Sequence, residues 1–249
     1  MAGVGVVVAL AAEAGVLAGR RLRPGMVERL EAGVLVQLCG MGPAAAAAAA
    51  QALADAGASA LAVFGVAGAL DPGFAPGTLL CPAQIVAEDG DHYAVDSAWR
   101  FRLAGRLGES LSDRTLLTVR LPLLTPQAKA EAQRRFDAVA VDMESAAVAG
   151  VARSRGLPLL VLRAIADGAG DSIPGPLADA IDRWGRARPL AVAAALLRQP
   201  PMLLRLPRLA GTMNRATVAL RSAIRASGAD LAYGPASHLA NEANQAVRE

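Results

Sequence analysis

The sequence predicts one α/β domain in which a twisted mixed β-sheet is flanked by helices. Short runs of β-branched and apolar residues alternate along the chain with longer alanine- and leucine-rich segments. This alternation is typical of an α/β sheet rather than of a sandwich or a helical bundle. The 249 residues are 54% hydrophobic and 19% charged, which suffices for one sizeable core and excludes disorder over most of the chain.

The predicted elements follow from these runs. Several of the expected strands are apolar on both faces, as strands buried inside a sheet are. They span residues 4–9, 34–39, 60–65, 78–86, 139–141 and 159–165. Helices are expected over residues 43–56, 126–136, 144–155 and 176–197, with Pro43 suited to a first helical turn.

The character of the chain changes near residue 200, where Pro200, Pro201 and Pro207 interrupt regular structure. We therefore divide the chain into a compact domain, residues 1–199, and a C-terminal extension, residues 200–249. Residues 209–226 predict a basic amphipathic helix, and residues 233–249 a poorly ordered tail. The apolar positions of that helix are Leu209, Met213, Ala216, Leu220 and Ile224. The helix either packs on the core or on a second subunit, or it makes a peripheral contact with an anionic membrane.

Composition excludes several classes of protein. A net charge of +3 and an aromatic content of 3% argue against nucleic-acid binding. Cys39 and Cys81 lie in apolar stretches, so we expect two reduced, buried thiols in a cytoplasmic protein, and too few ligands for zinc. No stretch reaches the roughly 20 apolar residues of a spanning helix. Residues 4–17 do not resemble a signal peptide, because no basic region precedes them and Glu13 interrupts the run.

Two glycine clusters each follow an apolar strand. Gly40-Met41-Gly42 opens a helix, where glycine allows close backbone approach to a ligand, and Gly65-Val66-Ala67-Gly68 is expected to form a second loop. Two such loops at the carboxyl ends of neighbouring strands would form the crevice in which α/β sheets bind ligands. The alternative is that both are simple connections.

Acidic residues follow three of the expected strands. Glu144 would accept hydrogen bonds from a sugar diol beside the apolar Met143, or else Asp142 caps the helix and Glu144 stabilises its first turn. Asp167, if desolvated, would protonate a leaving group, or else it is a loop or cap residue. Glu13 is a third such acid, or a solvated residue in a first helical turn.

The order and spacing of these motifs resemble the purine nucleoside phosphorylase and nucleosidase superfamily. The resemblance covers roughly residues 4–197. It is closest to the nucleosidases that act on methylthioadenosine and S-adenosylhomocysteine, and within the superfamily to the hopanoid-associated phosphorylases, which are linked to adenine removal from adenosylhopane. The motifs that carry it are Ala9-Leu10-Ala11-Ala12-Glu13, Gly40-Met41-Gly42, Gly65-Val66-Ala67-Gly68, Val141-Asp142-Met143-Glu144 and Arg163-Ala164-Ile165-Ala166-Asp167.

The resemblance implies a role for each candidate residue. Glu144 would bind the ribose hydroxyls and Met143 would pack against the sugar, while Val66, Ala67 and Gly68 would line the substrate site. Asp167 would assist departure of the purine through N7, and Glu13 would orient or deprotonate the attacking water. The segment expected to bind adenine, around residues 117–125, lacks the phenylalanine seen in relatives, and Leu121, Leu123 and Leu124 would fill its role. Glycosidic cleavage passes through an oxocarbenium-like state that needs both a proton donor and a positioned nucleophile.

The sequence also departs from the family pattern. Val66 and Ala166 replace serines of the relatives, so two hydroxyl groups are lost. Residues 62–64 (Ala62, Val63 and Phe64) occupy the neighbourhood in which phosphorylases carry a phosphate-binding arginine. Because a phosphate dianion needs cationic partners, we expect water to be the nucleophile. Arg20, Arg21 or an arginine of a second subunit would supply the alternative.

These considerations predict an adenine-releasing N-ribosyl hydrolase or phosphorylase without a metal or organic cofactor, using inorganic phosphate only if it is phosphorolytic. The expected substrate is a free or lipid-linked adenine nucleoside with a large apolar 5′ group. The resemblance implies a homodimer, in the cytoplasm or at the inner face of the membrane. The alternatives are a nucleosidase for methylthioadenosine or S-adenosylhomocysteine, and a catalytically silent nucleoside- or lipid-binding protein on the same fold.

Overall fold

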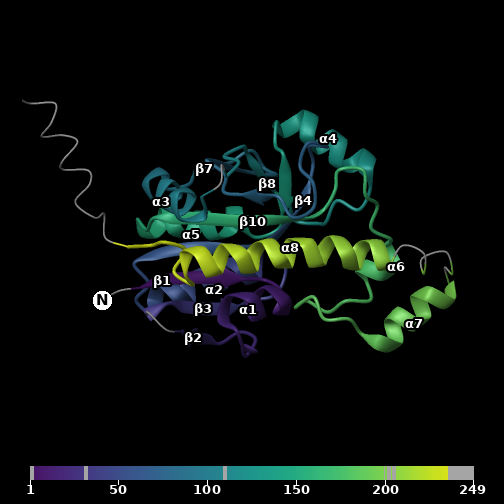
Figure 1. The fold of residues 1–249 in the computed structure, drawn as a ribbon, viewed down its shortest axis with the longest axis horizontal. Helices are drawn as coiled ribbons and strands as arrows, with labels where there is room; N and C mark the ends of the chain where they lie inside the picture. The colour runs from purple at the N-terminus through teal and green to yellow at the C-terminus, as the bar shows by residue number, and fades with distance from the viewer. Residues whose placement is uncertain are drawn as a thin grey trace, which may run out of the picture.

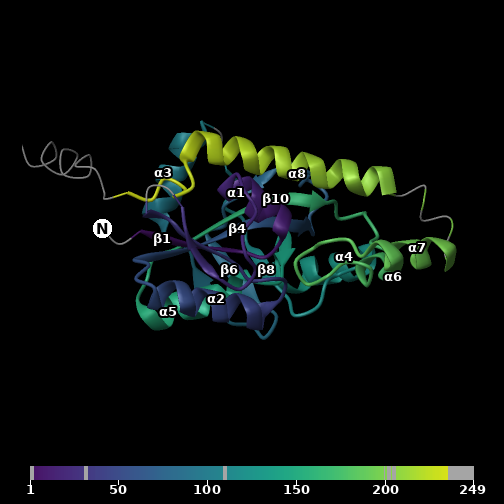
Figure 2. The ribbon, with the colours of Figure 1, turned by 90° about the horizontal axis from the view of Figure 1, so that it is seen from below.

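A computed structural model of the chain describes residues 3–30, 33–108, 111–198, 200, 203 and 206–234. These residues form three layers, with a sheet between two layers of helices (Figures 1 and 2). Helices α1 (Ala11–Ala18), α3 (Ser97–Leu107) and α8 (Leu206–Ser227) cover one face of the sheet. Helices α2 (Pro43–Asp55) and α5 (Ser145–Arg155) cover the other. The predicted α/β architecture is confirmed.

The described residues contribute ten strands to the sheet, and four of them form its buried centre. Strand β4 (Ala60–Ala69) pairs in parallel with β1 (Val4–Val8) and with β10 (Leu159–Asp167), and β1 pairs in parallel with β3 (Leu35–Leu38). Because these four strands run in the same direction, their carboxyl ends meet at one edge of the sheet. Every residue of β1 and β3 is buried, which explains why these strands are apolar except at Gln37, whose amide donates to the carbonyl of Gly25 at 3.1 Å.

The remaining strands extend the sheet on both sides in the order β2-β3-β1-β4-β9-β8-β6-β7. The far end of β4 pairs antiparallel with β9, and β5 pairs with β10. Their bounds are β2 Val27–Arg29, β5 Leu79–Leu80, β6 Gln84–Ala87, β7 His92–Ala94, β8 Leu116–Thr118 and β9 Ala140–Asp142. The other helices are α4 Pro126–Phe136, α6 Gly175–Ala178 and α7 Pro189–Arg198.

Three expected elements differ from the structure. The strand expected over residues 78–86 is two strands, β5 and β6, because Pro82 lies between them and lacks the N–H that a sheet requires. The helix expected over residues 176–197 is two helices, α6 and α7, separated by a turn in which Gly185 has a φ of 73°. The second glycine cluster is not a loop, because residues 65–68 continue strand β4.

The C-terminal helix α8 packs on the core. Ala216, Leu220 and Ala223 are buried and belong to the main hydrophobic cluster. Beyond the helix, the carbonyl of buried Leu231 accepts a hydrogen bond of 2.7 Å from the indole of Trp99. Of the alternatives for this helix, the structure therefore shows packing on the core. Ala216 and Leu220 are positions of the predicted apolar stripe, and Ala223 is next to its last position, Ile224. Most of the predicted tail, residues 235–249, lies outside the described residues.

Cys39 and Cys81 are both buried free thiols, as expected. Burial raises the pKa of each to about 12, so neither thiol ionises near neutral pH. Among the described residues, no helix combines the length and the apolar character needed to cross a bilayer.

Candidate active site

One pocket at the carboxyl edge of the sheet gathers all of the predicted site residues except Leu121 and Leu124. The side chain of Leu121 is 76% exposed, and neither leucine lines the pocket. Leu123 does line it, beside a small hydrophobic cluster beneath α4. The other predicted residues in the lining are Glu13, Val66, Ala67, Gly68, Met143, Glu144 and Asp167.

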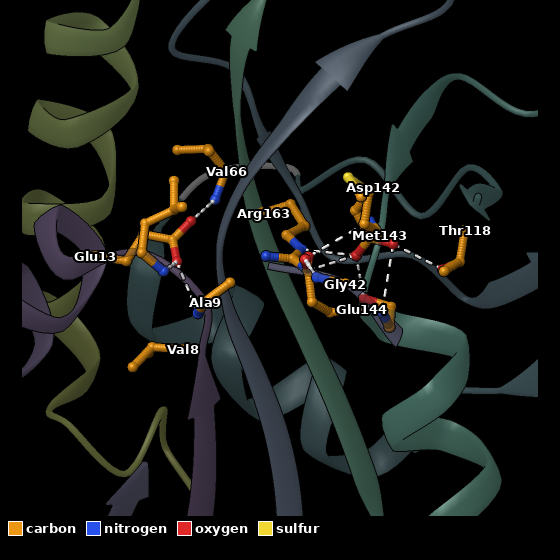
Figure 3. Close-up of polar contacts among 12 residues, drawn as sticks. Val8, Ala9, Glu13, Gly42, Val66, Thr118, Asp142, Met143, Glu144 and Arg163 are labelled. Atoms are coloured by element: carbon orange, nitrogen blue, oxygen red, sulfur yellow. Dashed lines mark hydrogen bonds and ion pairs between the residues drawn. The ribbon is translucent and has the colours of Figure 1, made fainter. Parts of the chain in front are cut away.

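Glu13 lies in the first turn of α1, directly after β1, and both of its carboxylate oxygens are hydrogen-bonded. Oε2 accepts from the backbone N–H groups of Ala9 and Leu10, at 3.1 and 2.8 Å, and Oε1 accepts from that of Val66 at 2.8 Å (Figure 3). Burial raises the pKa of Glu13 to about 7, although the charge of Arg163 and the N–H donors oppose the rise. The interpretation of Glu13 as a solvated helix residue is therefore wrong.

Gly65 allows Glu13 to approach the centre of the sheet. A Cβ atom at position 65 would fall against the Glu13 carboxylate and 2.7 Å from Nη1 of Arg163. Strand β4 thus carries a glycine because two charged side chains, from α1 and β10, meet its backbone.

Arg163 is buried in β10 and binds two carboxylates. Its Nε donates to Oδ2 of Asp142 at 2.9 Å, and its Nη2 donates to the same oxygen and to Oε2 of Glu144 at 3.1 Å (Figure 3). Both acids raise the pKa of the guanidinium, which therefore stays charged. Burial raises the pKa of Glu144, and the attraction to Arg163 partly offsets this rise.

Asp142 and Glu144 have different surroundings. Asp142 also accepts from the hydroxyl of Thr118 at 2.7 Å and from the backbone N–H of Ser145 at 3.3 Å, so it fixes the start of α5. Glu144 accepts from the backbone N–H of Gly42 at 3.0 Å. Gly42 has a φ of 102°, which favours glycine, and its contact joins the first glycine cluster to the acid at the pocket wall.

Asp167 reaches the pocket through an irregularity in the sheet. The register between β10 and β4 shifts between Ile165 and Asp167, so that Asp167 lies opposite Gly68. The Asp167 carboxylate forms an ion pair with Nζ of Lys129 from α4. Burial raises the pKa of Asp167 above its usual range, and the ammonium of Lys129 opposes this rise.

Lys129 is a site residue for which the sequence analysis gave no role. Its side chain is 1% exposed, and its ammonium donates to Asp167 and to the carbonyls of Gly168 and Asp171, at 2.8 and 3.3 Å for the two carbonyls. All three of its N–H bonds therefore have acceptors. The sequence did set Lys129 apart, because it is the single lysine in a chain whose other basic residues are arginines and histidines. Arg163 had a signal too, as a charged residue within an otherwise apolar strand.

Apolar side chains complete the pocket. Met41 of the first glycine cluster, Val119 after β8, Ile173 after β10 and Met213 of α8 line it beside Met143. The C-terminal helix therefore contributes to the pocket as well as to the core. No group of three or more His, Cys, Asp or Glu side chains that would suit a metal ion occurs in the part of the chain that the structure describes.

The sequence matches a family model described as the phosphorylase superfamily over residues 5–199. The chain belongs to this superfamily. It is an enzyme of the nucleosidase or phosphorylase type. A comparison with curated proteins found no match.

Solved structures with the same fold include nucleosidases. The futalosine hydrolase of Helicobacter pylori is 17% identical with a TM-score of 0.65, over 90% of this chain and 97% of that one. The 5′-methylthioadenosine/S-adenosylhomocysteine nucleosidase of Neisseria meningitidis, in complex with methylthio-immucillin-A, is 17% identical with a TM-score of 0.68, over 93% and 99%. The Campylobacter jejuni nucleosidase is 17% identical with a TM-score of 0.64, over 92% and 99%. At these identities the likeness establishes the fold.

Proposed function

We propose that this enzyme hydrolyses the N-glycosidic bond of an adenine nucleoside that carries a large apolar 5′ group, converting adenosylhopane and water into adenine and ribosylhopane. The observation that carries the proposal is that Glu13 and Asp167, from different parts of the chain, line one pocket together with Glu144 and Met143. A base for water, an acid for the purine and an acceptor for the sugar hydroxyls are the groups that this reaction requires.

In the proposed mechanism, Asp167 donates a proton to N7 of the departing purine. Its raised pKa favours the protonated form that this step needs. Glu144 accepts hydrogen bonds from the ribose hydroxyls and stabilises the positive charge that develops on the sugar. Glu13, with a pKa of about 7, is partly ionised at neutral pH and accepts a proton from the attacking water. Met143 packs against the sugar.

The charge of the pocket supports water as the nucleophile. Its charged lining consists of Glu13, Asp142, Glu144, Asp167 and Lys129, and the lysine is bound to Asp167. A phosphate dianion would meet carboxylates here rather than free cations. The backbone N–H groups of residues 9, 10 and 66, which would otherwise suit an anion, already bind the Glu13 carboxylate.

Other candidate cations lie away from the pocket lining. Arg20 is paired with Glu28, and Arg21 is exposed. Residues 62–64 are buried side chains of β4 and carry no charge. Phosphorolysis of the same substrate is therefore the less favoured reaction.

The apolar part of the lining supports an apolar 5′ substituent. Ile173 after β10 and Met213 of α8 lie in the lining with Leu123 and Val119. The choice of hopane, and of a homodimer located in the cytoplasm or at the inner membrane face, rests on the family resemblance.

The test is adenine release from detergent-solubilised adenosylhopane, with and without inorganic phosphate, with mass analysis of the sugar product. Release without phosphate and a free ribosyl lipid are expected. Strict dependence on phosphate would instead establish phosphorolysis. Release only from methylthioadenosine or S-adenosylhomocysteine would establish a small-substrate nucleosidase.

Asp167→Asn separates an enzyme from a binding protein on the same fold. We expect the variant to lose about 10²- to 10⁴-fold in turnover while its affinity for the nucleoside is retained. Binding of the nucleoside by the wild type without any turnover would overturn the proposal.

A further inference from the structure

Helix α7 exposes large apolar side chains at one end of the molecule. Leu190 and Leu197 of this helix are 88% and 83% exposed, and Leu203 just beyond it is also exposed. Figures 1 and 2 both place α7 away from the sheet, at the end opposite to α3. A single exposed leucine is ordinary, but three in one short segment mark a contact surface.

The same part of the chain is strongly basic. Residues 183–229 contain nine arginines and neither aspartate nor glutamate, in a chain with a net charge of +3. The rest of the chain is therefore acidic overall. Arg186, Arg188 and Arg198 are exposed and flank the exposed leucines in the sequence. We call these three arginines, with Leu190, Leu197 and Leu203, the α7 surface.

We propose that the α7 surface docks on an anionic lipid bilayer. Leucines that enter the boundary between headgroups and acyl chains, beside arginines that bind lipid phosphates, are the combination that holds a protein on such a surface. A second copy of the chain fits this surface less well. A two-fold contact through α7 would bring the arginines of both copies together, and like charges repel.

This surface is distinct from the one that the sequence suggested. Helix α8 packs on the core through Ala216, Leu220 and Ala223, so these positions are not free to enter a membrane. Met213 of the predicted stripe lines the pocket. Leu190 and Leu197 of α7 belong to neither the main nor the second hydrophobic cluster of the described residues.

The α7 surface is connected to the pocket through the chain. The segment that carries it leaves the pocket wall after Ile173 and returns at α8, whose Met213 also lines the pocket. This proposal does not depend on which nucleoside is cleaved.

The test is flotation of the full chain with vesicles of phosphatidylcholine alone or mixed with phosphatidylglycerol, without any nucleoside. We expect binding only to the mixed vesicles, and weaker binding at 1 M salt, where the screening length falls to about 3 Å. Leu190→Glu combined with Leu197→Glu should reduce the bound fraction at least tenfold. These side chains are exposed, so folding should be preserved, which circular dichroism checks.

Phe101→Glu is the matched control. Phe101 is an 82% exposed apolar side chain on α3, at the opposite end of the molecule, and its substitution should leave vesicle binding unchanged. Equal binding by the double variant, an equal loss in the control, or no binding of the wild type to either vesicle would overturn the proposal. Light scattering gives the oligomeric state of the wild type and of the double variant. If the wild type bound no vesicles and formed an oligomer that the double variant did not form, a second copy of the chain would be the occupant of the α7 surface. Adenine release in detergent is measured separately, so failure of the proposed reaction would not affect this result.

Discussion

At the residue scale, the acid proposed to protonate the purine is paired with a buried ammonium. Lys129 lowers the pKa of Asp167 while burial raises it, and burial is the larger effect. The protonation of Asp167 therefore depends on a balance of two opposing contributions from its surroundings. A carboxyl group that must donate a proton near neutral pH needs such a balance, because full ionisation would leave it without a proton.

Substitution of Lys129 should move this balance. In Lys129→Met the ammonium that lowers the pKa of Asp167 is lost, so this pKa should rise further. Because the protonated acid then persists to higher pH, the basic limb of the pH profile of kcat for adenine release should shift upwards. Lys129→Arg keeps the charge and should keep the limb in place. An unchanged limb together with a lower melting temperature would show that Lys129 serves only to hold the loop after β10.

At the element scale, β4 is the strand that brings the pocket together. Its residue 65 meets the side chains of Glu13 and Arg163, and its residue 68 lies opposite Asp167.

Gly65→Ala would place a methyl group against both charged side chains, which should cost about 1 to 3 kcal/mol of unfolding free energy and reduce adenine release. Gly105→Ala in α3 is the control, because a Cβ there meets no other atom and alanine favours a helix by about 1 kcal/mol. Equal stability of the two variants in urea unfolding would contradict this role of Gly65.

The elements that the sequence predicted well are those fixed by local pattern. Strand β1 is a buried apolar run, β3 is buried and apolar except at Gln37, and α4 begins at Pro126 and ends at Phe136 as expected. Strand β4 was predicted too short, because glycines within residues 65–68 indicate a loop unless the side chains packed against them are known. Helix α3 was missed, since its buried residues Trp99 and Leu103 are separated by arginines that weaken the apolar pattern.

In the site, too, the residues fixed by a local sequence pattern were predicted and those fixed by packing were not. Glu13, Glu144 and Asp167 were identifiable because each follows or ends an apolar strand. Parallel strands β1 and β10 bring Glu13 and Asp167 to one edge of the sheet. Glu144 follows β9, which pairs antiparallel with the far end of β4. Their partners were not identifiable in this way. Lys129 is 38 residues from Asp167 in sequence, and Arg163 is 21 residues from Asp142, so only the packing of α4 and β10 brings them together. Leu121 and Leu124 were misplaced because nothing in the local sequence distinguishes them from Leu123.

At the scale of the whole molecule, the buried acids link stability to pH. The pKa of Glu13 rises from 4.5 to about 7 on folding, so the folded state binds this proton more tightly than the unfolded chain does. The resulting stabilisation is complete below about pH 4.5 and is lost as pH rises to about 7. At 1.36 kcal/mol per pKa unit, the loss is about 3 kcal/mol.

Glu13→Gln isolates this contribution, because glutamine does not titrate while the other buried acids remain. Urea unfolding of both proteins at pH 5 and pH 8 gives the difference in unfolding free energy at each pH. Glutamine has one oxygen where Glu13 uses two, so its amide group faces a backbone N–H, and the variant should be less stable than the wild type at pH 5 by about 1 to 3 kcal/mol. That gap should narrow or reverse by pH 8, where the wild type holds an ionised, buried carboxylate. A gap of equal size at both pH values would mean that Glu13 titrates as it does in the unfolded chain, and the base proposed for the attacking water would then be fully ionised at neutral pH.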